Sequence, residues 1–226
     1  MNEVRIMQEL MEIAETGERN MKNDEWVIVD TETTGLSQPI SVVEIAAQRM
    51  NGWDPAGEPF RVLLNHDVPM DPGAEAVHGY SREYLRKHGL DPRVAHAEFN
   101  RYCGDLPIVA YNISFDWDRA LMPEYRRLKV PQTGVRGFCA LALARRTITE
   151  TTNLKLSTLK EHFRLSEAPS HRGLNDVLTL VALFQAVFRD RLELAGISGF
   201  EELAKFSKSS PIAVCLTRLR VAFSGR

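Results

Sequence analysis

The hydrophobic pattern begins with short strand-like runs and then changes to helical stripes. WVIV at 26–29 is apolar on both faces, which is typical of a strand inside a covered sheet. VVEIAAQRM at 42–50 and FRVLLN at 60–65 predict two more strands, joined by the Gly- and Pro-containing stretch NGWDPAGEP. A fourth strand is expected at 107–111, where PIVAY is again apolar.

Apolar residues recur at helical spacing in several later segments. The expected helices lie near 81–88, at 93–103, after Ser114 as an N-cap, at 156–163 and at 174–188. The last of these is apolar nearly all round, so we expect it to be buried. FCALALARR at 138–146 fits a strand or a helix. Strands first, then helices interleaved with single strands, predict an α/β domain with a mixed sheet.

The two ends of the chain are expected to extend a central domain that spans 24–192. Residues 1–23 predict an N-terminal helical extension, because apolar positions repeat at helical spacing over 3–16. Residues 193–226 predict a basic C-terminal helical extension, since 203–226 contains five basic residues and no acidic residue. This extension is either a solvated helix or a surface for nucleic acid or a partner protein.

The balance of basic and acidic residues excludes one class of nucleic-acid-binding protein. The 226 residues include 28 basic and 30 acidic side chains, for a net charge of −2, which excludes a protein that holds duplex DNA by charge alone. It allows a nucleic-acid enzyme that recruits divalent cations. Cys103, Cys139 and Cys215 form no CxxC motif, so we expect buried free thiols in a reducing compartment. No signal peptide or membrane span is recognisable, which predicts a cytoplasmic protein without membrane contact.

Four acidic residues are candidates for chemistry. Asp30 and Glu32 end the first strand two positions apart, so both side chains should leave from one face. Like charges so placed repel one another unless a cation lies between them. Asp116 and Asp176 lie in the first turns of two helices, and all four could meet at one sheet edge. Hard oxygen ligands suit Mg²⁺ or Mn²⁺. Taken singly, acids in the positions of Asp116 and Asp176 are more often helix-capping residues, and Asp30 and Glu32 also fit a polar strand end that runs into a turn.

Four segments resemble the motifs of a known family. DTETTG, AVHGYS, YNISFD and HRGLND follow one another over 30–35, 76–81, 111–116 and 171–176. They are similar to the DnaQ-like 3′–5′ exonucleases of the DEDDh branch, the family of the proofreading subunit of bacterial replicative polymerase. The resemblance covers about 24–190. It implies a ribonuclease H-like three-layer fold, with a mixed sheet of about five strands flanked by helices.

The resemblance also implies roles for individual residues. Asp30, Glu32, Asp116 and Asp176 would hold two Mg²⁺ ions, for which Mn²⁺ could substitute, and His171 would be the general base. The residues expected to bind the terminal nucleotide are Thr33, Gly35, Leu36, His78, Asn112 and Phe115, with Phe115 stacking on the base. One position departs from the pattern, since Tyr111 stands where a histidine is common. Arg172, and not a tyrosine, stands four positions before Asp176, and His171 holds the position five before it that marks the His branch. The remaining aromatic and imidazole side chains are assigned to structure: Trp26, Trp53, Trp117, His66, His88, His96 and His162.

The expected function is therefore a metal-dependent 3′→5′ exonuclease that acts on single-stranded or frayed DNA ends. Its products would be nucleoside 5′-monophosphates, formed by a two-metal mechanism. An RNA-trimming exoribonuclease is one alternative, and a polymerase-associated subunit that acts mainly through binding is another. The expected partners are nucleic acid with a free 3′ end and a polymerase or other replication or repair protein, with the chain as a monomer or homodimer.

Overall fold

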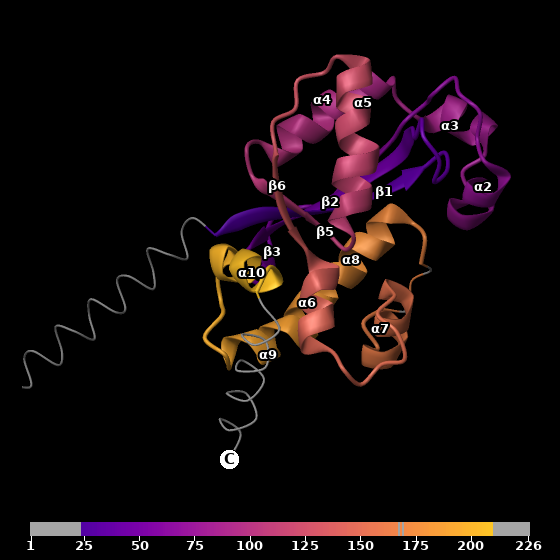
Figure 1. Ribbon diagram of the computed structural model, residues 1–226. Coiled ribbons are helices and arrows are strands. Elements are labelled where there is room, and N and C mark those ends of the chain that lie inside the picture. Colours follow the sequence, from indigo (N-terminus) through magenta and orange to yellow (C-terminus); the bar gives the residue numbers. More distant parts are fainter. Residues whose placement is uncertain (1–23, 167, 169, 210–226) are drawn as a thin grey trace, which may run out of the picture.

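The computed structural model describes residues 24–166, 168 and 170–209, and its centre is a mixed sheet of six strands in the order β3-β2-β1-β5-β6, with β4 also paired to β2 (Figure 1). The strands are β1 (Glu25–Thr33), β2 (Val42–Asn51), β3 (Asp54–Pro55), β4 (Phe60–Leu63), β5 (Pro107–Ala110) and β6 (Val135–Cys139). β1 pairs antiparallel with β2 and parallel with β5. The predicted α/β class and mixed sheet are confirmed, with β3 as a short strand within the expected connection.

Helices cover both faces of the sheet and one end of it, which makes the fold the expected ribonuclease H-like sandwich (Figure 1). One layer contains α4, η1 and α5, and the other contains α6, α8, η2 and α10. The helices are α2 (Pro72–His78), α3 (Arg82–His88), α4 (Pro92–Cys103), η1 (Ser114–Leu121), α5 (Met122–Leu128), α6 (Ala140–Thr147), α7 (Leu156–Phe163), α8 (Gly173–Leu183), η2 (Phe184–Phe188), α9 (Arg189–Glu193) and α10 (Phe200–Ser207).

The side chains of β1 alternate between the two helical layers. Trp26 and Ile28 are fully buried in the cluster with α8, whereas Val27 and Val29 are fully buried in the cluster with α4 and α5. The Trp26 ring lies 4.9 Å from that of Phe184 in η2. Burying a large apolar side chain contributes roughly 1.5–3 kcal/mol, so both faces hold the strand firmly. The rigid strand continues directly into Asp30.

Several predicted boundaries change in the structure. Ser114 is the first residue of η1, and no side chain caps this helix, so the predicted N-cap is wrong. The ambiguous segment 138–146 divides, with Phe138 and Cys139 ending β6 and the rest forming α6. The predicted helix at 174–188 becomes α8 followed by η2, a stretch with i→i+5 hydrogen bonds. Helix α2 was not predicted, although Asp71 caps it through Gly73 N–H at 2.7 Å.

The expected extensions are described only in part. Residues 1–23 and 210–226 lie outside the described residues, and Cys215 with them. Within the described part, α10 packs against α6 and β6 and buries Leu203 and Phe206. Of the helices in the described part of the chain, none has the length and apolar character needed to span a bilayer.

The residues assigned to structure are found in the core or in packing contacts. Trp26, Trp53 and Trp117 are buried, as predicted. Cys103 is a buried free thiol, whereas Cys139 is only partly buried. Among the histidines assigned to structure, His66 and His96 both contact the buried carboxylate of Glu124.

That carboxylate, Glu124 of α5, joins four segments. Its Oε1 lies 3.0 Å from His66 Nε2 and 2.9 Å from His96 Nε2. Its Oε2 accepts hydrogen bonds from Val42 N–H at 2.8 Å and from Arg127 at 2.9 Å. Burial by itself would raise the pKa of Glu124, but the hydrogen bonds with the two histidines lower it to about 2. A buried carboxylate with this many partners fixes α5 to the start of β2.

We predict that Glu124 makes the protein acid-sensitive. A carboxylate whose folded pKa lies below its unfolded value stabilises the fold above the unfolded pKa and loses that contribution as the pH falls through the folded pKa. The free energy of unfolding should therefore drop from about pH 4.5 down to about pH 2, by on the order of 3 kcal/mol. Urea unfolding at a series of pH values will measure it. Glu124→Gln should remove this dependence, and the exposed control Asp118→Asn should keep it; equal slopes for both variants would refute the assignment.

Candidate active site

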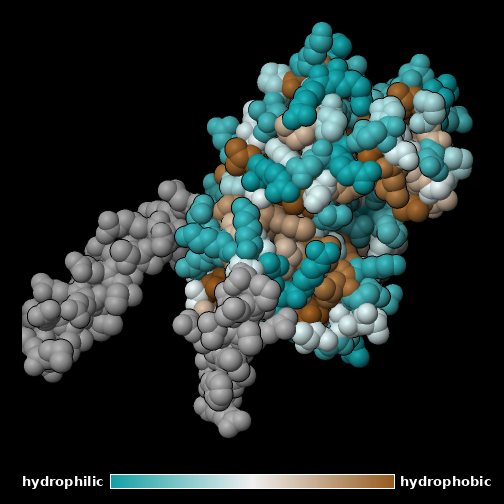
Figure 2. Space-filling model, in the orientation of Figure 1, coloured by the Kyte–Doolittle hydropathy of each residue, from teal (hydrophilic) through white to brown (hydrophobic). Residues whose placement is uncertain are grey.

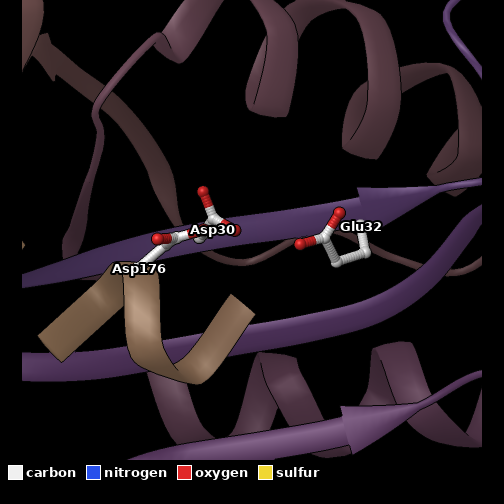
Figure 3. A group of neighbouring side chains, drawn as sticks. All are labelled: Asp30, Glu32 and Asp176. Atoms are coloured by element: carbon white, nitrogen blue, oxygen red, sulfur yellow. The ribbon is translucent and has the colours of Figure 1, made fainter. Parts of the chain in front are cut away.

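Three of the four predicted acids lie together at the end of β1. Because Asp30 and Glu32 continue the Trp26–Ile28 face of the strand, both side chains point toward α8. Asp176, in the first turn of α8, meets them there. One carboxylate oxygen from each of Asp30, Glu32 and Asp176 lies within 4.8 Å of the other two (Figure 3). The strand repeat places Asp30 and Glu32 on one face, and the packing of α8 on the sheet brings in Asp176 from more than one hundred residues later in the chain.

The fourth acid, Asp116, approaches from the opposite helical layer. It lies in the first turn of η1, and its Oδ1 accepts hydrogen bonds from Thr31 N–H at 3.1 Å and Thr31 Oγ1 at 2.8 Å. Thr31 belongs to the other face of β1. The structure therefore places Asp116 beside the other three acids without making it a member of their close cluster. After burial, the charge of Asp116 is the largest cause of the raised pKa of Asp30.

The acids repel one another in a partly buried place. Burial, and then the charges of neighbouring acids, raises the pKa of Asp30 well above its usual range and that of Glu32 to about 8. Burial also raises the pKa of Asp176, and it raises that of Asp116 to about 6 against the hydrogen bonds from Thr31. A divalent cation would relieve this repulsion, and close carboxylate oxygens are the ligands that Mg²⁺ and Mn²⁺ prefer. The donor set therefore fits such a metal.

His171 lies in the turn that leads into α8. Its backbone N–H donates to Asp176 Oδ2 at 2.8 Å, and its φ of +61° is left-handed, which few residues other than glycine adopt. The side chain is exposed and borders the same cavity as the acids. The hydrogen bond from the His171 backbone to Asp176 thus keeps the candidate base next to the acid cluster.

A cavity of about 610 Å³ opens beside the acids. Asn112 and Phe115, two of the six residues expected to bind the terminal nucleotide, line it. An apolar wall of the cavity comes from the segment after β5, from α6 and from the segment that leads into α7, and it includes Tyr111, Leu141, Leu154 and Leu156. Apolar residues show between α6 and α7 on the surface of this side (Figure 2). Tyr111, the departure from the family pattern, donates its hydroxyl to the Leu154 carbonyl and so supports this wall.

The other four predicted nucleotide-binding residues lie outside the lining of this cavity. Thr33 is buried, and its Oγ1 donates to the Gly35 carbonyl at 3.0 Å. Leu36 is 71% exposed. His78 is buried at the end of α2, and burial lowers its pKa. The turn after β1 packs against the start of α2, where a Cβ on Gly35 would lie 3.2 Å from Asp71 Cβ.

Sequence reasoning missed a buried acid beside the site. Glu44 of β2 stands opposite Glu32 in the β1–β2 register and is completely buried. Its Oε1 accepts from Arg61 Nε at 2.5 Å, and its Oε2 accepts from Tyr80 Oη and from Gly173 N–H, both at 3.0 Å. The sequence did contain a signal for it, because Glu44 is a single charged residue within the otherwise apolar strand segment VVEIAA. Glu44 ties the first residue of α8 to the sheet.

Comparison with known proteins now identifies the family. Residues 27–184 match the RNase T family, which is described as exonuclease. The chain belongs to this exonuclease family. It is similar to the DNA polymerase III subunit epsilon of Escherichia coli, at 29% identity over 183 residues, with 75% of this chain and 73% of that protein covered. The same subunit of Salmonella typhimurium is 30% identical over 175 residues, with 71% and 70% covered.

Other relatives are much longer than this chain. The PolC-type DNA polymerase III of Bacillus subtilis is 26% identical over 186 residues, which are 82% of this chain and 13% of that protein. A relative from Mycobacterium tuberculosis is matched over 30% of its length. Among solved structures, exonuclease X in complex with 5′ overhanging duplex DNA has a TM-score of 0.58 at 26% identity, with 80% of this chain and 99% of that chain covered. An E. coli ExoI–ssDNA complex has a TM-score of 0.65 at 15% identity, with 76% and 42% covered, and so shows the shared fold.

We predict that the burial of the acids, together with the repulsion among them, destabilises the metal-free fold at high pH. Unfolded Glu32 ionises near pH 4.5 and folded Glu32 near pH 8, so the free energy of unfolding should fall as the pH rises between these values. Glu32→Gln should remove the decline and raise stability at pH 8 in chelator by several kcal/mol. Urea unfolding at pH 5 and pH 8 measures both effects. Glu25→Gln, at the exposed start of β1, is the control; a Glu32→Gln protein less stable than wild type at pH 8 would contradict the prediction.

Proposed function

We propose that this exonuclease is a metal-dependent 3′→5′ enzyme that acts on single-stranded or frayed DNA ends. The observation that carries the proposal is the cluster of Asp30, Glu32 and Asp176, with Asp116 and His171 at its border and an open cavity beside it. A cleft lined by four carboxylates repels a phosphodiester until cations occupy it. Two bound Mg²⁺ ions would supply an activated water and stabilisation of the departing 3′-oxygen.

The residues of the chain have separate tasks in this proposal. Asp30, Glu32 and Asp176 hold the metal ions from one rigid strand and one helix end, and Asp116 completes the set from η1. His171 takes the proton of the attacking water at an imidazole nitrogen, which requires the neutral ring. Its exposed side chain, on the turn that borders the cavity, is open to an arriving substrate end.

Two groups of residues, one on each side of the acids, contact the terminal nucleotide in this proposal. Phe115 offers a ring for stacking on the terminal base, and Asn112 offers an amide for polar contacts. Thr33, Gly35, Leu36 and His78 enclose the terminal nucleotide at the end of β1, on the side toward α2. The similarity to polymerase subunits supports association with a polymerase as a further part of the proposal. A cytoplasmic location also stays a prediction.

A substrate panel tests the reaction class, the polarity and the metal requirement together. Single-stranded, mismatched and duplex DNA and a matching RNA, each labelled at the 5′ or the 3′ end, are incubated with Mg²⁺, Mn²⁺, Ca²⁺ or chelator. We expect mononucleotides from the 3′ end of single-stranded and mismatched DNA with Mg²⁺ or Mn²⁺, and no turnover with Ca²⁺ or chelator. Full activity in chelator would refute the two-metal reaction, and faster release from RNA would favour the exoribonuclease.

Replacing His171 tests the general base. Positioned base catalysis contributes about 10²–10⁴-fold, so His171→Ala should lower turnover by that order. Metal affinity, measured by titration with Mn²⁺, should not change, because His171 is not among the proposed ligands. His162→Ala, an exposed histidine on α7, should behave as wild type. If His171→Ala kept wild-type turnover under saturating Mg²⁺, the residue would have no part in proton transfer.

A further inference from the structure

Arg172 follows His171 directly, and the proposed reaction gives it no role. Its side chain does not point into solvent. One guanidinium nitrogen, Nη1, donates to the carbonyl of His78. The guanidinium also lies over the ring of Tyr80, 4.8 Å from the centroid. Arg172 thus connects the turn that carries His171 with the segment 78–80, and the two bonded residues are 94 positions apart in the chain.

The 78–80 segment is built to receive this side chain. Gly79 has a φ of +71°, and a Cβ on it would lie 2.9 Å from Arg172 Nη2. Any larger residue at 79 would therefore displace the guanidinium. Tyr80 is buried, and its hydroxyl is held by Glu44 at 3.0 Å and by Arg61 at 3.0 Å. The surface on which Arg172 rests is consequently fixed to the sheet.

The backbone on both sides of Arg172 is also anchored. His171 N–H donates to Asp176, and Gly173 N–H donates to Glu44 at 3.0 Å. A Cβ on Gly173 would lie 3.2 Å from Glu44 Oε2, so the absence of a side chain allows this close approach. Three consecutive residues are therefore tied to three different places, and only the Arg172 contact reaches the segment with His78. A turn with a left-handed residue needs such outside support, because that conformation is unfavourable by itself.

We propose that Arg172 is a positioning residue, which clamps the His171 turn onto the His78–Tyr80 segment and so holds the general base at the acid cluster. The inference rests on the proposed function, since it requires His171 to act as the base. Arg172 binds two groups of the same chain, the carbonyl oxygen of His78 and the ring of Tyr80. The planar guanidinium of arginine can contact both at once, whereas the ammonium of lysine is less suited to do so. The clamp also joins the base to a residue of the proposed nucleotide site.

The test compares Arg172→Gln in two backgrounds. The substrate is the p-nitrophenyl ester of thymidine 5′-monophosphate, which has no strand to bind, and kcat and KM are measured with saturating Mg²⁺. A small misplacement of a catalytic group costs about 10²-fold, so Arg172→Gln should lower kcat by that order and leave KM and Mn²⁺ affinity unchanged. Arg172→Lys should recover part of the loss. Arg86→Gln, an exposed arginine on α3, should match wild type.

The His171→Ala background separates positioning from other roles. If Arg172 acts through His171, Arg172→Gln should cause almost no further loss there, because the two changes remove the same contribution. An equal fold-loss in both backgrounds, or a rise in KM, would overturn the clamp and indicate a direct contact with substrate. Wild-type turnover in His171→Ala would overturn the clamp and the general base together. Absence of hydrolysis by the wild-type protein would instead refute the proposed function itself.

Discussion

The two-residue repeat of β1 is the constraint on which the site depends. Because the strand is buried on both faces, its even-numbered side chains must meet one helical layer and its odd-numbered side chains the other. Asp30 and Glu32 therefore face Asp176, while Thr31 faces Asp116. A register slip of one residue would turn the carboxylates away from α8. The same alternation of side chains therefore sets which apolar residues of β1 pack in each core and which way its two acids point.

The close acids are held together against their own repulsion. The raised pKa values of Asp30 and Glu32 show that burial and neighbouring charge both oppose ionisation there. Hydrogen bonds supply part of the restraint, since Thr31 holds Asp116 and Glu44 holds the start of α8. The core beneath supplies the rest. In this respect the fold holds an unfavourable arrangement that a divalent cation would relieve, and the donor set is compatible with such an ion.

Two buried carboxylates outside the close cluster, one of them beside it, hold the frame in different ways. Glu124 joins α5 to β2 and to two histidines, and Glu44 joins β2 to β4, to Tyr80 and to α8. Each is buried and accepts hydrogen bonds from several donors, so its oxygens are satisfied in the interior. Neither was predicted as important, because a single acid in an apolar segment gives no indication of its partners. Both lie in segments whose secondary structure was predicted.

The local pattern was sufficient for those features that depend on neighbours in the chain. The shared face of Asp30 and Glu32, the buried helix after 174 and the mixed sheet all follow from periodicity, and the order of four motifs identified the family. Tertiary structure alone decided that Asp116 turns to Thr31, that Tyr111 supports a cavity wall and that Arg172 rests on Tyr80. Each of these pairs residues far apart in sequence, and which polar groups meet is set by how the helical layers pack on the sheet. The chain thus encodes its elements and acid positions locally, whereas contacts between distant segments determine which partner each polar side chain finds.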